Sequence, residues 1–319
     1  MVINSSFYMQ LALDEAWLYQ GLTYPNPAVG CTVVGKHGEI LAVEAHKRAG
    51  LPHAEVQALK VAYFKLTDDA NILSLELSSE IHSYLIAHHN DIFKYCSLYT
   101  TLAPCTSQGK TPACSNLIDN LKIKDIYIGA KDNYQSSFKN AEYGILEKRC
   151  KDLLEPFNLW QKDKFIFFKW AQRLDASTDS SVSSSASRKN VHAMRNLCDL
   201  LVIGGNTVRE DRPTLDARLV NGRAPDILIY SRQKDFDTTI PLFNVENRKV
   251  IISDTFDEVH RYNNIMIEGT QNMQNATKHI VDFNLCYLSY SDKYELLNTK
   301  KEPQDIIMWM KNKQREEEV

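Results

Sequence analysis

The sequence predicts an α/β protein with two domains. Predicted strands alternate with predicted helices along most of the chain, which is the pattern of an α/β fold with a largely parallel sheet. The length of 319 residues is about that of two domains of roughly 150 residues, each large enough for its own core. With 44% hydrophobic and 24% charged residues, the composition is that of an ordinary globular protein.

Composition also argues against several classes of protein. The net charge of −3 gives no electrostatic reason to expect binding to nucleic acid or to a membrane surface. No apolar run reaches the length of about 18 residues that a membrane span needs, and the N-terminus lacks the pattern of a signal peptide. The seven cysteines are scattered and odd in number, which favours a reducing compartment. We therefore expect a cytoplasmic protein.

The first half of the chain contains the following predicted elements. A helix begins after Ser5 or Ser6 and runs to about Gln20, because apolar residues recur at helical spacing. Residues 66–95 are polar and mixed, and are interpreted as an inserted surface element whose His88-His89 pair is solvated. The other predicted elements are strands at 29–34 and 39–45 joined by a glycine-containing turn, a helix after His53, strands at 97–102 and 125–130, and helices at 115–121 and 141–154.

A domain boundary is predicted near residues 155–164. Pro156 should end the preceding helix there, and the charge density rises. This gives a first domain of residues 1–155 and a second of residues 164–319. The second domain opens with a strongly apolar strand at 165–171, and a later buried strand enters a turn at Gly204-Gly205.

Residues 53 to 114 contain the most informative pattern in the chain. His53-Ala54-Glu55 is followed by Pro104-Cys105 and, after eight residues, Cys114. One imidazole and two thiols can hold zinc and leave a coordination position for water, while a glutamate that is not a ligand can move that water's protons. His53 and Cys114 should each lie in the first turn of a helix. At Cys114 the helix dipole favours the thiolate form of the side chain.

Two simpler interpretations compete with a zinc site. His-Ala-Glu is common on helix surfaces, and two cysteines are usually just small buried side chains. The combination with Pro-Cys and the intervening glycine is more specific, and favours zinc. A structural zinc would need a fourth protein ligand. None is evident close to Cys105 or Cys114, although Cys31, Cys96 or His46 could supply one.

The motifs of the first half resemble those of the deaminase of riboflavin biosynthesis. The segment 102–114 is similar to that family's loop T-L-E-P-C-S-H-x-G-(K/R)-T-P-P-C, with Ala103 and Ser107 as departures. Segments 26–31 and 45–50 resemble its N-P-x-V-G and H-x-x-x-G motifs. The resemblance implies a cytidine-deaminase-like three-layer α/β/α fold, with Glu55 as the catalytic acid and base. It also implies that Asn26, His46 and Lys110 orient the substrate ring or its phosphate.

The second half resembles the reductase of the same bifunctional family, which has a dihydrofolate-reductase-like fold and uses NADPH. The similar segments are 172–175, 207–218 and 265–270. Because only 50 residues follow Gly269, we expect an abbreviated domain. On this resemblance, the residues that contact NADPH are Ala171, Thr207, Asp211 and Ser231. Those that hold the sugar phosphate are Arg195, Leu215, Arg218 and Glu268, and paired arginines suit a phosphate because the guanidinium fork binds its oxygens bidentately.

The resemblance implies a bifunctional enzyme with zinc and NADPH as cofactors. It would deaminate 2,5-diamino-6-ribosylamino-4(3H)-pyrimidinone 5′-phosphate and then reduce the ribosyl side chain to ribityl. Its partner would be this small phosphorylated pyrimidine, with no nucleic acid or membrane, and a homo-oligomer is compatible with the sequence. Three alternatives stay open: a deaminase with a vestigial reductase half, a tRNA or nucleobase deaminase, and a non-enzymatic nucleotide-binding protein stapled by zinc.

Overall fold

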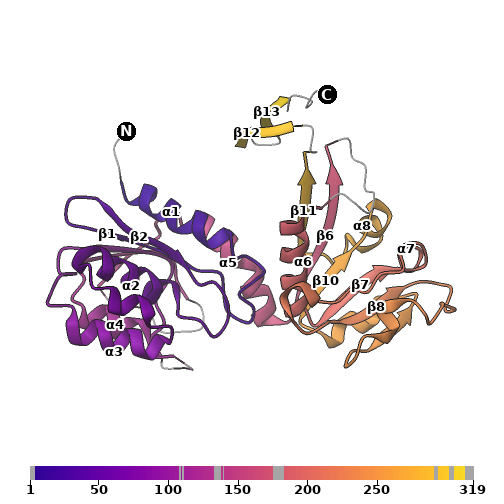
Figure 1. Ribbon diagram of the computed structural model, residues 1–319, viewed down its shortest axis with the longest axis horizontal. Helices are drawn as coiled ribbons and strands as arrows, with labels where there is room; N and C mark the ends of the chain where they lie inside the picture. The colour runs from indigo at the N-terminus through magenta and orange to yellow at the C-terminus, as the bar shows by residue number, and fades with distance from the viewer. Residues whose placement is uncertain are drawn as a thin grey trace, which may run out of the picture. The chain divides into compact units, whose positions relative to one another are not determined.

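The computed structural model divides the chain into two compact units, Met1–Lys162 and Asp163–Val319 (Figure 1). It describes residues 4–107, 109, 111–132, 138, 140–174, 183–290, 294–301 and 305–312. In this part of the chain, no helix is both long and apolar enough to cross a membrane.

The first unit is built on a five-stranded mixed sheet of order β2-β1-β3-β4-β5. Its strands are β1 Gly30–Val34, β2 Ile40–Ala45, β3 Ser97–Leu102, β4 Asp125–Ala130 and β5 Glu142–Tyr143. β1 is antiparallel to β2 and β3, whereas β3, β4 and β5 are parallel. The prediction of a largely parallel sheet is therefore wrong for this unit, because the β1–β2 hairpin reverses the chain. The hairpin turn requires Gly38, whose φ of +86° is in the left-handed region.

Helices cover both faces of this sheet and make three layers (Figure 1). α1 Ser5–Trp17 and α5 Glu147–Lys162 pack on one face, and α2 Ala54–Thr67, α3 Ser78–His88 and α4 Cys114–Asn120 on the other. α1 is capped by Asn4, whose side chain accepts a 3.2 Å hydrogen bond from the Phe7 N–H, and not by Ser5 or Ser6. It ends at Trp17, before the predicted Gln20.

Residues 66–95 belong to the core of the first unit, so their interpretation as a surface element is wrong. They form the end of α2, the 3₁₀ helix η1 Ala70–Ser74 and α3. Ile72, Ile81, Leu85 and Phe93 from this segment are fully buried in the cluster that also holds α2 and α4. The polar composition of the segment reflects its outer face. His88 lies on that face, exposed and stacked on Tyr84, as predicted. The prediction of a solvated pair is wrong for His89, whose side chain is only 15% exposed.

The last helix of the first unit differs most from its prediction. α5 begins at Glu147, after the short strand β5, and continues through Pro156 to Lys162. A proline inside a helix removes one backbone hydrogen bond, but the buried Pro156 does not end this helix. The division between the two units falls after Lys162, inside the predicted boundary region of 155–164, and the first unit extends past residue 155.

The second unit contains a six-stranded sheet of order β11-β6-β10-β7-β8-β9, in which all neighbouring strands are parallel. The strands are β6 Phe165–Arg173, β7 Leu200–Gly204, β8 Asp226–Tyr230, β9 Val250–Ser253, β10 Asn264–Glu268 and β11 Phe283–Ser289. The helices are α6 Ser185–Leu197, α7 Gly205–Asp211 and α8 Gln271–Thr277, with 3₁₀ turns η2 Arg218–Val220, η3 Pro241–Asn244 and η4 Asp257–Arg261. Because the strands are parallel, their carboxyl ends meet at one edge, where ligands of open α/β sheets bind.

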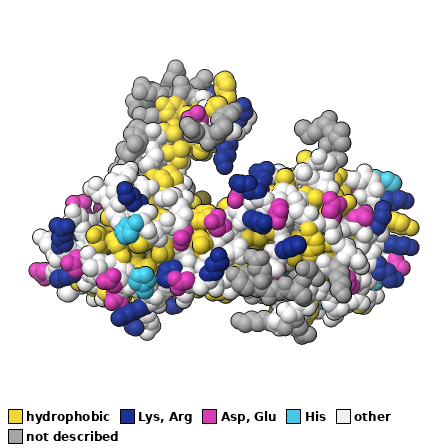
Figure 2. All heavy atoms as spheres, turned by 180° about the vertical axis from the view of Figure 1, so that it is seen from behind, with side chains coloured by type: hydrophobic (Ala, Val, Ile, Leu, Met, Phe, Trp, Pro, Cys, Tyr) yellow, Lys and Arg dark blue, Asp and Glu magenta, His cyan; other side chains and the backbone are white. Residues whose placement is uncertain are grey.

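The short length of the segment after Gly269 was the reason to expect an abbreviated domain. This segment forms α8, the edge strand β11 and a hairpin. The hairpin consists of β12 Tyr294–Lys301 and β13 Ile306–Asn312, paired antiparallel in a sheet of their own. Hydrophobic side chains gather on it (Figure 2), and Leu297, Ile306 and Trp309 are each about three-fifths or more exposed, at 59%, 62% and 69%.

Candidate active sites

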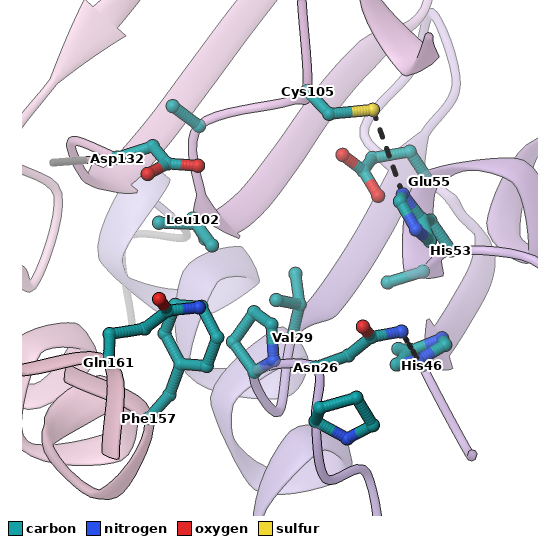
Figure 3. A pocket seen from close by; sticks show the side chains of 14 residues that line it. Asn26, Val29, His46, His53, Glu55, Leu102, Cys105, Asp132, Phe157 and Gln161 are labelled. Carbon is teal, nitrogen blue, oxygen red and sulfur yellow. Dashed lines mark hydrogen bonds between the residues drawn. The ribbon is translucent and has the colours of Figure 1, made fainter. Parts of the chain in front are cut away.

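The fold of the first unit brings His53, Cys105 and Cys114 together. His53 is the residue that immediately precedes α2, Cys105 follows β3, and Cys114 is the first residue of α4. The His53 Nδ1 atom lies 3.4 Å from the Cys114 Sγ atom and 3.7 Å from the Cys105 Sγ atom. Figure 3 shows His53 and Cys105 at the edge of a pocket. The predicted juxtaposition of these three side chains is thus present.

This trio fits zinc in chemistry and in spacing. With Zn–N of about 2.05 Å and Zn–S of about 2.3 Å, tetrahedral ligands lie about 3.6 Å apart, close to the two distances found here. Hydrogen bonds from Cys114 and His53 lower the pKa of the Cys105 thiol to about 4 against the effect of burial, which favours a thiolate at this ligand. The expectation of a thiolate at Cys114 is not met, because its hydrogen bond with Cys105 and its burial raise the pKa of the Cys114 thiol. Among the described residues, the group of possible metal ligands consists of His53, Cys105 and Cys114 and does not include Cys31, Cys96 or His46. Three protein ligands are the number that a catalytic zinc site requires.

Glu55 lies beside the trio without belonging to it. Its side chain is 4% exposed and lines the pocket, where Figure 3 shows the carboxylate close to Cys105 and His53. Burial raises its pKa to about 7, although His53 acts in the opposite direction. A carboxyl group of this pKa can accept a proton and return it near neutral pH, as a general acid and base must.

The pocket has a volume of about 270 Å³ and includes two of the three predicted ring-orienting residues. The His46 Nδ1 atom lies 3.1 Å from the Pro52 carbonyl, so this nitrogen carries the ring proton, and burial lowers the pKa of His46 to about 4. The other nitrogen of His46 therefore accepts from the Asn26 Nδ2 atom at 3.0 Å. This bond fixes the orientation of the Asn26 amide, so that its carbonyl oxygen does not face His46 and remains a hydrogen-bond acceptor. Lys110, the third residue, lies outside the described residues.

Three further pocket residues were not predicted from the sequence. Asp132 follows β4, and Phe157 and Gln161 come from α5; Figure 3 shows Phe157 and Gln161 on the side of the pocket away from Glu55. The position of Asp132 after a predicted strand, parallel to the strand that precedes Cys105, was a usable signal. Phe157 and Gln161 had no such signal, because the helix was expected to end at Pro156.

In the second unit, Arg195 and Glu268 form a buried ion pair. The Arg195 Nε and Nη2 atoms donate to the two Glu268 oxygens at 2.8 and 3.0 Å, and each side chain is 12% exposed. Lys169, which sequence reasoning missed, lies 3.6 Å from the same carboxylate. Burial opposes ionisation, but Arg195 and Lys169 lower the pKa of Glu268 to about 2. A charged residue inside the apolar strand 165–171 was the signal for Lys169.

The other two predicted sugar-phosphate residues are placed differently. Arg218 is exposed and donates to Asp216 at 2.7 Å, in the turn η2 that packs against α6, the helix of Arg195. Leu215 is 6% exposed, and its carbonyl accepts a 2.9 Å bond from Arg248. Its side chain therefore belongs to the core, and any contact with a ligand would involve its backbone.

A second pocket, of about 530 Å³, opens at the carboxyl ends of β7 and β8. Of the residues predicted to contact NADPH, Thr207 and Ser231 line it, whereas Ala171 on β6 and the exposed Asp211 do not. A glycine is required at 205, because a Cβ there would lie 2.6 Å from the Ser231 side chain. The Gly-Gly turn thus lets β7 and α7 approach Ser231 closely.

Comparison with known families and proteins agrees with this geometry. Residues 3–130 match the family model of the cytidine and deoxycytidylate deaminase zinc-binding region, and residues 164–309 match that of the RibD C-terminal domain. The riboflavin biosynthesis protein RibD of Aquifex aeolicus is 30% identical over 308 residues, which cover 88% of this chain and 78% of that protein. The chain belongs to the RibD family.

Other members of the RibD family show the same relationship. The RibD protein of Synechocystis is 29% identical to this chain. The matched region covers 79% of this chain and 66% of the Synechocystis protein. A deaminase/reductase from Thermotoga maritima has a similar fold, with a TM-score of 0.59 at 24% identity over 97% of this chain and 98% of that one. RibD of Acinetobacter baumannii superposes with a TM-score of 0.57 at 21% identity. These solved structures confirm the predicted fold class.

Family membership confirms the recognition made from the sequence. The chain carries the zinc-binding deaminase region and the NADPH-dependent reductase domain of the RibD family, so its cofactors are zinc and NADPH. It is an enzyme of riboflavin biosynthesis. Membership of the RibD family argues against two of the alternatives, a tRNA or nucleobase deaminase and a non-enzymatic nucleotide-binding protein with a structural zinc.

Proposed function

We propose that this chain catalyses both reactions of the RibD family on a small phosphorylated pyrimidine. The first removes an amino group from 2,5-diamino-6-ribosylamino-4(3H)-pyrimidinone 5′-phosphate, and the second reduces the ribosyl side chain to ribityl. The observation that carries the proposal is the buried Glu55 beside the His53, Cys105 and Cys114 trio in one pocket. A cytoplasmic location, a homo-oligomeric state and the absence of nucleic acid stay predictions.

In the deaminase pocket, His53, Cys105 and Cys114 would hold zinc, which when bound activates a water molecule for attack on the amine-bearing ring carbon. The Asn26 carbonyl, oriented by His46, would accept a hydrogen bond from the ring. Glu55 would take one proton from the attacking water and pass it to the ring nitrogen. It would then take the remaining proton from the new hydroxyl group and give it to the amino group, which departs as ammonia while the ring carbonyl forms. Water is consumed, ammonia is released, and Glu55 ends in its starting protonation state.

In the second unit, the buried carboxylate of Glu268 would fix Arg195 at the edge where the parallel strands end. Two donors of the guanidinium bind Glu268, and the remaining N–H groups would meet the sugar phosphate, with Arg218 on the neighbouring turn. NADPH supplies the hydride that opens the ribosyl ring at its C1′ carbon, and the chain's contribution is to place the two reactants.

Metal analysis tests the deaminase site directly. Purified protein should contain about one zinc per chain, and Cys105→Ser should lose most of it together with deaminase activity, because two of three protein ligands hold a metal poorly. Cys96→Ser is the matched control, since Cys96 is buried outside the trio. Full deamination by zinc-free protein would refute the assigned role of the trio.

A second assay tests the reductase half. When the deaminated intermediate is supplied, the protein should oxidise NADPH, which is followed by the loss of absorbance of the reduced nicotinamide. The expected product carries a ribityl chain. Undetectable oxidation, with deamination intact, would leave a monofunctional deaminase with a vestigial second half.

A further inference from the structure

The deaminase pocket has one wall that takes no part in the proton transfers of Glu55. Phe157 and Gln161 form this wall. They are four residues apart on α5, so their side chains leave the same face of the helix. Figure 3 shows both on the side of the pocket away from Glu55. The wall therefore meets a part of the substrate that is distant from the reacting ring carbon.

Aromatic contacts hold this wall against the segment that carries Asn26. The Trp160 ring lies 4.9 Å from the Tyr24 ring in an edge-on contact, and 5.9 Å from the Phe157 ring. Tyr24 stands two residues before Asn26 in the sequence. Edge-on and tilted ring pairs of this kind stabilise a fixed arrangement. The positions of Phe157 and Gln161 are thus set relative to the residue that orients the pyrimidine ring.

The wall combines an aromatic ring with an uncharged amide. Phe157 is half-buried, whereas Gln161 is exposed and makes no hydrogen bond to a described residue, so its amide is available to donate and to accept. Among the described lining residues there is no lysine or arginine to meet a phosphate. An amide beside an aromatic ring suits a sugar, because the hydroxyl groups bind the amide and the C–H face packs on the ring.

The proposed substrate has a sugar at the corresponding place. Its electrophilic carbon is C2, which bears an amino group between two ring nitrogens, and this carbon must lie at the zinc trio beside Glu55. The 5-amino and 6-ribosylamino groups are then on the edge of the ring that points away from Glu55. This orientation directs the ribosyl group toward the wall of Phe157 and Gln161.

We infer that Phe157 and Gln161 bind the ribosyl group and make the deaminase select a ribosylated pyrimidine over the free base. The Phe157 ring packs against the ribose, and the Gln161 amide binds its hydroxyl groups. Because these contacts are remote from C2, their binding energy holds the pyrimidine ring in the reactive orientation at Glu55. The inference rests on the proposed deaminase function.

Three compounds test the inference on the full-length zinc protein. They are the phosphorylated substrate, the nucleoside that lacks its phosphate, and the free base 2,5,6-triamino-4(3H)-pyrimidinone, and ammonia release gives kcat/KM for each. The wild type should use the nucleoside at least about tenfold better than the free base, since a truncated substrate loses remote binding energy.

Gln161→Ala should lower kcat/KM about threefold to tenfold for both ribosylated compounds, the effect of one hydrogen bond, and less than about twofold for the free base. Gln161 is exposed, so this change leaves the fold intact. Phe157→Ala should lower the same two values by about tenfold. The zinc content should stay at the wild-type level in both variants.

Phe7→Ala is the matched control for the aromatic substitution. Phe7 is on α1, is 37% exposed and does not line the pocket. Its replacement should change none of the three kcat/KM values by more than about twofold.

The pattern across the three compounds decides the inference. Losses for the phosphorylated substrate and the nucleoside, with the free base unaffected, support it. Equal losses for all three compounds, or a loss confined to the phosphorylated one, overturn it, because the wall then does not recognise the sugar. If the zinc-loaded wild type deaminates none of them, the proposed deaminase activity is refuted. Equilibrium binding of the same compounds to wild type and Q161A then decides the inference by the same pattern.

Discussion

Glu55→Gln is expected to lower the rate constant of deamination about a thousandfold, within the range of roughly 10² to 10⁴ that general acid–base catalysis contributes. Glutamine keeps the size of the side chain in this 4% exposed position, but it cannot take up and return a proton. The zinc content should stay at the wild-type level, because Glu55 is not one of the three ligands. Ammonia release under saturating substrate, together with metal analysis of the same sample, measures both quantities.

Glu39→Gln provides the matched control for this result. Glu39 lies in the exposed turn before β2, so the same chemical change there should leave the rate within about twofold. An E55Q protein that keeps zinc and more than a tenth of the wild-type rate would exclude Glu55 as the proton carrier.

Arg195→Met is expected to lower the free energy of unfolding of the second unit by about 3–5 kcal/mol, because it leaves the buried Glu268 carboxylate without its main partner. Arg218→Met removes the same kind of group from an exposed pair with Asp216, whose side chains are 61% and 17% exposed. That change should cost only about 0–1 kcal/mol. Urea unfolding of both variants, followed by circular dichroism, gives the comparison.

The effect of Arg195→Met should depend on pH in a defined direction. Glu268 has a folded pKa of about 2, lower than the value of about 4.3 expected in the unfolded chain, so the unfolded chain binds more protons between these values. The stabilisation is complete above about pH 5 and is lost as the pH falls toward 2. The difference between wild type and R195M should shrink over the same interval. A constant difference would show that the lost stability comes from packing and not from charge.

Much of the fold follows from local patterns. The predicted strands at 97–102 and 125–130 coincide with β3 and β4, and the turn between 34 and 40 forms the expected hairpin. Residues 66–95 were misjudged because composition reports the outer face of α3, while Ile81 and Leu85, four residues apart, face the core. Averaging polarity over the segment concealed this periodicity.

The site residues also differ in how far the sequence alone could predict their contacts. His53 and Cys114 could be predicted to meet because each stands where a helix begins at one edge of the sheet. The pair of Arg195 and Glu268 is made by residues 73 positions apart on a helix and a strand, so only the tertiary structure brings them into contact. Glu268 pairs with Arg195 and Lys169, and its predicted contact with the substrate stays a prediction.

The course of α5 bears on how the two activities can be separated. A fragment ending at residue 155 would lack the last turns of this helix, including Phe157 and Gln161 from the pocket wall and Trp160, whose ring lies 4.9 Å from that of Tyr24. Such a fragment would deaminate poorly for a reason inside the first unit. The defect would mimic a requirement for the reductase half. A genuine test of whether one half depends on the other therefore needs the cut after Lys162.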